Sequence, residues 1–182
     1  MAIDIKLIFQ QKRQLKQIEE LRPQLFRVAA AWCNDQMLAD DIVQDALAKA
    51  VQNLSQLKDP SALKGWLFTI LNNQWREYLR RNRPCLDIDE LVFIADSNPE
   101  EDEQRHQTCN MVRSAIAELP LSQRQTITLV DLEDMSYQEV ALALDIPIGT
   151  VMSRLNRARK ALLQKIEHQE KAMSISYLRR VK

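Results

Sequence analysis

A polar face runs along residues 150–160, where side chains that can hydrogen-bond to DNA recur at helical spacing. Its outward-pointing members are Met152, Ser153, Asn156, Arg157 and Lys160. Hydroxyl, amide and guanidinium groups can bond to base edges in a major groove, and the cations can also contact the flanking phosphates. The pattern therefore predicts a helix that reads duplex DNA. A solvated helical hairpin with ordinary surface charge is the plainer alternative.

Two helices joined by a tight turn would position this face. Ser136 and Glu139 have the spacing of a capping box, which predicts the start of the first helix. Pro147 and Gly149 oppose its continuation, and Thr150 is a suitable N-cap for the second helix. The apolar stripe of the second helix consists of Val151, Leu155, Ala158 and Leu162. These signals together predict a helix-turn-helix.

The composition indicates a folded, helical chain. With 182 residues it can form one ordinary domain or two small ones, and 46% of its residues are hydrophobic. Only two residues are glycine, and few segments alternate apolar and polar residues, so little or no sheet is expected. The formal net charge is zero, but acidic residues dominate positions 83–107 and basic residues dominate positions after 150. Zero total charge therefore does not exclude binding to nucleic acid.

The sequence predicts an all-α protein of two small helical domains joined by an acidic linker. In the first domain, Asp59 can cap a helix that has Pro60 at its first position. In the second domain, Ser122 and Gln125 have the spacing of another capping box. The expected segments are an N-terminal helical extension (1–20), a bundle of three to four helices (21–83), the linker (84–107), the helix-turn-helix domain (108–168) and a tail (169–182).

Two more polar faces lie on helices of the first bundle. Asp41, Gln44 and Asp45 form an acidic surface that suits a basic or amide-rich partner helix, with a merely solvated surface as the alternative. The next helix presents side chains that can bond to bases and phosphates. These are Thr69, Asn72, Asn73, Arg76 and Arg80. Nearby Trp75 and Tyr78 are candidates either for stacking on unpaired bases or for core packing.

Other function classes have little support in the sequence. It contains no nucleophile with a base, no phosphate-binding glycine loop and no clustered metal ligands, so no catalytic residue, metal, cofactor or small-molecule substrate is expected. The three cysteines, Cys33, Cys85 and Cys109, suit reduced thiols better than disulfides, and a redox role for them is left open. No secretory leader or membrane-spanning run is apparent, so a cytoplasmic protein without membrane insertion is expected.

Five segments of the chain resemble extracytoplasmic-function (ECF) sigma factors, a group of the sigma-70 family. Residues 39–46, 65–73 and 78–81 resemble region 2 of that group. Residues 119–124 and 149–159 resemble its region 4. The resemblance extends in order from residue 21 to about residue 163, and the pairing of both regions across an acidic linker is specific. Region 4 alone also resembles many other helix-turn-helix regulators.

This resemblance implies a protein that binds core RNA polymerase, recognises the −35 and −10 promoter elements and assists promoter melting. The residues implied to bind the polymerase, called here the 40–45 face, are Asp40, Asp41, Val43, Gln44 and Asp45. The residues implied to meet the −10 element, called the 69–80 face, are Thr69, Asn72, Asn73, Arg76 and Arg80. The residues implied to read the −35 element, called the 150–157 face, are Thr150, Ser153, Arg154, Asn156 and Arg157. The resemblance further implies restraint by an anti-sigma factor.

Two positions depart from the family pattern. Met152 stands where many members have a cation, so an apolar contact is expected to replace a cationic one. Asp145 stands at a turn position often held by glycine, which it can fill because Asp enters left-handed conformations readily. A stand-alone helix-turn-helix regulator and a helical adaptor for proteins are the alternatives. The first leaves the 69–80 face without a task, and the second leaves the 150–157 face unexplained.

Overall fold

The computed structural model describes residues 5–82 and 103–180, and every regular element in these ranges is a helix. The N-terminal half contains α1 (Ile5–Cys33), α2 (Gln36–Gln52), 3₁₀ turns at Leu54–Gln56 and Pro60–Ala62, and α3 (Leu63–Arg81). The C-terminal half contains α4 (Glu103–Ala117), α5 (Leu121–Ile127), a π-helical turn (Thr128–Leu132), α6 (Tyr137–Leu144) and α7 (Ile148–Arg180). The all-α prediction is confirmed.

Short polar side chains set the boundaries of the N-terminal helices. Asn34 adopts a left-handed conformation (φ 52°) that ends α1, and the carboxylate of Asp35 accepts hydrogen bonds from two backbone N–H groups at the start of α2. Asp59 caps the turn that leads into α3, with Pro60 at its first position, as predicted. The expected boundary after residue 20 is absent, because α1 continues from the extension through Pro23 into the bundle.

The helix-turn-helix has the predicted boundaries at its first helix. Ser136 and Glu139 form both bonds of the capping box, and Asp145 ends α6 in the left-handed region (φ 53°). The prediction that Thr150 caps the second helix is wrong. α7 begins at Ile148, two residues before Thr150, and the N–H of Thr150 already bonds to the carbonyl of Pro147. Gly149 therefore lies within the first turn, where a helix tolerates it.

The second predicted capping box is also wrong. Pro120 occupies the N-cap of α5 and no side chain caps that helix, so Ser122 lies inside it. Beyond Ile127 the helix widens into the π-helical turn, whose hydrogen bonds span one more residue than those of an α-helix. The change of phase turns Leu132 outward, where it is 47% exposed.

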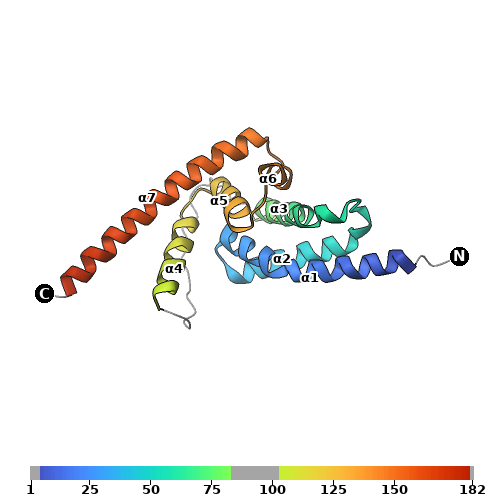
Figure 1. Cartoon of the computed structure of the whole chain (residues 1–182), viewed down its shortest axis with the longest axis horizontal. Coiled ribbons are helices and arrows are strands. Elements are labelled where there is room, and N and C mark those ends of the chain that lie inside the picture. Colours follow the sequence, from blue (N-terminus) through green and yellow to red (C-terminus); the bar gives the residue numbers. More distant parts are fainter. Residues whose placement is uncertain (1–4, 83–102, 181–182) are drawn as a thin grey trace.

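The two halves share one apolar core. Leu129, Met135 and Val140 of the C-terminal half join the core formed by α1, α2 and α3. A second, smaller core lies within the C-terminal half and consists of Leu119, Ile127, Leu155 and Ala158. In Figure 1, α6 accordingly lies beside α3, and α7 projects away from the bundle. The halves are thus packed together, whereas the sequence suggested two bundles separated by a linker.

Much of the predicted linker and the side chains of the tail lie outside the described residues. The described part of the acidic segment is helical from Glu103, so α4 begins earlier than the expected position 108. α7 runs to Arg180, which shows that the last helix continues beyond Lys171. Within the described ranges, no helix is both long enough and apolar enough to cross a membrane.

Candidate nucleic-acid interface

The 150–157 face lies on the first turns of α7, where the chain turns after α6. Val151 and Leu155 are buried on the inner side of the helix, which leaves Ser153, Asn156 and Arg157 exposed on the outer side. Arg157 Nε donates to the Ser153 carbonyl (3.2 Å), a weak contact that a DNA acceptor can replace. The predicted outward orientation of this part of the face is therefore confirmed.

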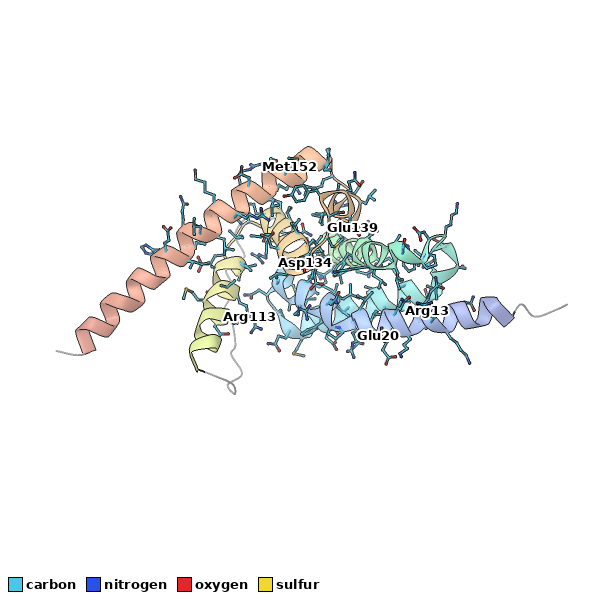
Figure 2. The ribbon with its side chains drawn as sticks, in the orientation of Figure 1. Arg13, Glu20, Arg113, Asp134, Glu139 and Met152 are labelled. Atoms are coloured by element: carbon cyan, nitrogen blue, oxygen red, sulfur yellow. The ribbon has the colours of Figure 1, made fainter. Side chains whose placement is uncertain are left out.

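The other two members of this face are less accessible. Thr150 and Arg154 are half-buried, and the carbonyl of Thr150 accepts a bond from the hydroxyl of Ser153 (3.1 Å). Met152 by contrast is 55% exposed, and Figure 2 shows it at the outer edge of the molecule near the start of α7. An apolar side chain therefore stands among the exposed polar groups of the helix.

The 69–80 face is divided by the packing of α6 on α3. Asn73 and Arg80 are exposed, and Arg80 forms an ion pair with Glu77 on its own helix (2.7 Å). Asn72 is only 1% exposed, because its amide donates to the backbone carbonyl of Ala143 in α6 (3.0 Å). Thr69 is half-buried and turns its hydroxyl to a carbonyl one turn earlier. The sequence brought these residues to one helical face, but the structure covers part of that face.

Arg76, one turn later on α3, also contacts the C-terminal end of α6. Its guanidinium donates to the carbonyl of Leu144 (2.6 Å) and lies 3.7 Å from a carboxylate oxygen of Asp145. The carbonyls of Leu144 and Ala143 have no partner in a following turn of α6, because the helix ends there. The amide and guanidinium of α3 therefore satisfy the free C-terminal end of α6.

Polar bonds at a second place join the two halves. The indole N–H of Trp32 in α1 donates to the hydroxyl of Thr128 (2.8 Å), inside the core. The guanidinium of Arg124 donates to the carbonyl of Trp32 (3.0 Å) and also to the carbonyls of Ala117 and Leu119 in its own half. Burial lowers the pKa of Arg124 below the usual value for arginine. Sequence analysis did not single out these residues, although Arg124 lies within a segment that carried the resemblance.

The 40–45 face is exposed and acidic, with one correction. Asp41, Gln44 and Asp45 point to solvent, and Asp40 is half-buried between Arg22 (2.9 Å) and Gln44 (2.7 Å). Val43 is fully buried in the core and is not part of this surface, because it lies on the apolar stripe of α2. A shallow hollow beside the face was not predicted, and it is lined by Phe26, Gln36, Met37, Asp40 and Asp41.

The aromatic residues of α3 are directed toward the protein. Trp75 is buried and stacks on Tyr78, with ring centroids 5.7 Å apart. Sequence analysis left two roles open for Trp75, and its burial favours core packing. A buried ring cannot stack on a base in this conformation. Trp66 is half-buried against the same core.

The chain also matches known proteins. Residues 17–84 match the family described as Sigma-70 region 2, and residues 109–162 match the family described as Sigma-70, region 4. The ECF RNA polymerase sigma factor EcfG of Rhodopseudomonas palustris (strain TIE-1) is 36% identical over 126 residues, which cover 68% of this chain and 68% of that protein. The chain belongs to the ECF RNA polymerase sigma factors.

Two further relatives agree with this assignment. The ECF RNA polymerase sigma-E factor of Escherichia coli (strain K12) is 34% identical to this sigma factor over 139 residues, covering 70% of this chain and 73% of that protein. In the co-crystal structure of the sigma factor RpoE with the anti-sigma factor NepR from Bartonella quintana, the sigma factor has 27% sequence identity to this one and a TM-score of 0.66. That similarity covers 84% of this chain and 95% of that chain.

The family matches divide the three faces between two regions. The region 2 match contains both the 40–45 face and the 69–80 face, and the region 4 match contains the 150–157 face. The contact between α3 and α6 is therefore a contact between region 2 and region 4 of this sigma factor.

Proposed function

We propose that this sigma factor directs core RNA polymerase to promoters by dividing the work among its three polar faces. The observation that supports the proposal most directly is the presence of both sigma regions, in order, on one chain whose helix-turn-helix exposes a polar recognition face. Sigma factors are transcription initiation factors. This chain would contribute the binding free energy that favours promoter opening, and it would catalyse no reaction itself. We place its action in the cytoplasm, where polymerase and promoter DNA meet.

Core polymerase would bind the 40–45 face. The exposed carboxylates of Asp41 and Asp45, with the amide of Gln44 between them, complement a basic or amide-rich helix. The neighbouring hollow offers an apolar contact through Phe26 and Met37, and Met37 is largely exposed. An acidic rim around apolar groups is suited to an interface, because the carboxylates orient the partner while the apolar groups provide burial.

The 150–157 face would read the −35 element as duplex. Ser153, Asn156 and Arg157 are exposed on one side of α7, and an arginine or asparagine in a major groove can form paired bonds to one base. Thr150 and Arg154 are half-buried and lie nearer to the protein, so phosphate contacts suit them better than base contacts.

The 69–80 face would capture bases of the −10 element after the strands separate. Unstacking a base costs on the order of a few kcal/mol, an amount that a pocket for the base together with stacking can offset. The loop that contains residues 55–60 lies at the start of α3 and is the proposed place for a flipped-out base. Polymerase would fix the separation between this face and the 150–157 face.

An anti-sigma factor is the further partner that we propose. The sigma factor of the Bartonella quintana structure is bound to such a protein, and its similarity covers most of this chain. A partner of this kind would compete with polymerase for region 2, region 4 or both.

Run-off transcription tests the function. The purified chain is mixed with core polymerase and a library of promoter fragments, and the start sites are sequenced. Defined start sites with shared −35 and −10 sequences are expected. A stand-alone regulator would instead bind duplex DNA without polymerase and would not initiate, and a protein adaptor would do neither.

A further inference from the structure

The first helix extends beyond the part of the chain that matches Sigma-70 region 2. α1 begins at Ile5, whereas the match begins at residue 17. The helix is packed on the bundle before that point, because Gln14 is only 5% exposed, one turn before the buried side chain of Ile18. The exposed side chains around Gln14 therefore hold fixed positions in the N-terminal half, although none of them belongs to the three polar faces.

Four exposed cations of the N-terminal half have no acidic partner among the described residues. They are Lys12 and Arg13 of α1, Lys49 of α2 and Lys58 of the connection between α2 and α3, called here the 12–58 cluster. Every other cation of this half whose side chain is described forms an ion pair, as Arg22 does with Asp40 (2.9 Å). Acidic residues are thus matched to the other cations, and the cluster can bind an anion from outside the chain.

The four cations lie at the same end of the bundle. α1 and α2 pack antiparallel across the tight turn at Asn34, and the ion pair between Arg22 and Asp40 fixes which of their residues lie level. Nine residues from this pair along each helix, Arg13 is about level with Lys49, because both helices rise equally per residue. Lys58 follows in the connection at residues 53–62. Figure 2 shows Arg13 at this end of the bundle.

Charge is separated along α2, since the carboxylates of the 40–45 face lie in its first half and Lys49 lies in its last turn. The basic end adjoins the loop at residues 55–60, to which the proposed function assigns a flipped-out base. We propose that the 12–58 cluster binds backbone phosphates of the promoter strand where it leaves this loop. This inference rests on the proposed function, and it adds a contact that lies partly outside the region 2 match.

Phosphate is the anion that this arrangement suits. Lysine and arginine side chains that contact the DNA backbone add affinity without reading bases, and each neutralised phosphate releases counterions. The reading helix has the same property, because Arg157 and Lys160 are exposed and the described ion pairs of α7 involve Arg159 and Lys165 instead. In both places, cations without an acidic partner lie beside a surface where nucleic acid is expected.

The first test measures how salt affects binding of the holoenzyme to a promoter fragment whose −10 segment is single-stranded. The promoter is one selected with the wild-type holoenzyme. Lys12→Gln and Arg13→Gln are combined, because both side chains are exposed and the amide removes only the charge. A plot of log affinity against log salt concentration is expected to become shallower by about 1.5, since two phosphate contacts are lost. The preference for −10 and −35 bases should stay unchanged.

Arg113→Gln is the matched control. Arg113 is also exposed and forms no ion pair within the described residues, but it lies on α4 in region 4, so the slope of the salt plot should not change.

The second test locates the strand directly. Lys16→Cys, on the exposed side of α1 next to the cluster, carries an iron chelate that cuts nearby DNA. Cys85 and Cys109 are replaced by Ser, and buried Cys33 is retained. Cutting by the holoenzyme is expected at the nucleotides that flank the −10 element on the side of the flipped-out base.

The possible failures of the inference and of the proposed function can be told apart. If the wild-type holoenzyme initiates and the double variant keeps the wild-type salt slope, the phosphate contact is overturned and the proposed function stands. Weaker association of the double variant with core polymerase in the absence of DNA would assign the cluster to the enzyme instead, and the absence of cutting near the −10 element would also overturn the contact. Failure of the wild-type holoenzyme to start at any promoter overturns both.

Discussion

Asn72 of α3 donates its side-chain amide to the backbone carbonyl of Ala143 in α6, at 3.0 Å and with almost no exposure to solvent. The oxygen of the same amide accepts a bond from Gln125 (3.2 Å). One side chain of region 2 thus contacts two helices of region 4. The residue that family resemblance assigns to promoter DNA is, in this conformation, part of the contact between the two regions.

Arg157→Ala is expected to weaken promoter binding and to relax the preference at one −35 base pair. The exposed guanidinium can form paired bonds to a guanine, and the loss of such bonds costs about 1–3 kcal/mol. Binding of holoenzyme to a −35 library measures the change. Arg159→Ala is the control, because that arginine is paired with Asp131 inside region 4. Unchanged sequence preference in Arg157→Ala would remove this residue from the reading face.

Asp45→Arg is expected to abolish association with core polymerase while the fold persists. The carboxylate is exposed on α2, so the change disturbs no core contact but places a cation against a basic or amide-rich partner. Because like charges repel, the amount of polymerase that co-purifies is expected to fall at least about tenfold. Glu19→Arg makes the same charge change on exposed α1 and should bind normally. If Asp45→Arg also binds normally, the docking surface lies elsewhere.

Arg124→Met is expected to lower the free energy of unfolding by about 3 kcal/mol, because three backbone carbonyls lose their donor inside the protein. Urea denaturation followed by circular dichroism measures the change. Arg113→Met removes a comparable side chain from an exposed position on α4 and should alter stability by less than about 0.5 kcal/mol. Equal stability of the two variants would contradict a structural role for Arg124.

Met152→Ala is expected to lower the preference for thymine at one −35 position. An exposed apolar side chain among polar ones can contact the methyl group of thymine, a contact worth roughly 1 kcal/mol. Deoxyuridine lacks only that methyl group. Replacing the thymine with deoxyuridine should weaken binding of the wild-type holoenzyme and leave Met152→Ala unaffected. An equal loss of binding in both proteins would show that Met152 does not contact the methyl group.

Cys33 is expected to resist alkylation in the folded protein. Burial raises the pKa of its thiol to about 11, so the reactive thiolate is scarce at pH 8, and the side chain is also inaccessible. Cys109 is exposed and should react. Mass spectrometry of peptides after brief treatment with iodoacetamide at pH 8, with and without denaturant, reports both sites. Rapid modification of Cys33 in the native protein would show that α1 opens locally.

The helices and their local signals were predictable because they depend on neighbouring residues. The capping box at Ser136 and Glu139, the turn at Asp145 and the outward face of α7 all follow from spacing within a few positions. The errors at Thr150 and Ser122 are also local, since a proline before each position allowed the helix to begin earlier. Helix ends are the least certain part of such an argument.

The pairing of helices was not predictable in the same way. The stripe on α3 shows that one side is apolar, but it does not show that the polar side meets α6. The bond between Asn72 and Ala143 joins positions 71 residues apart, and its acceptor is a backbone group that carries no sequence signal. Val43 illustrates the converse, because resemblance assigned it to a surface while its place on the apolar stripe buried it.

The continuous core has a consequence for how this protein tolerates change. Leu129, Met135 and Val140 belong to region 4, yet they fill space beneath helices of region 2. A cavity made at any of them is felt by both regions at once, and the chain should melt in one cooperative step. Substitutions at these three positions are therefore expected to need compensating changes in the helices opposite, even where neither side touches DNA.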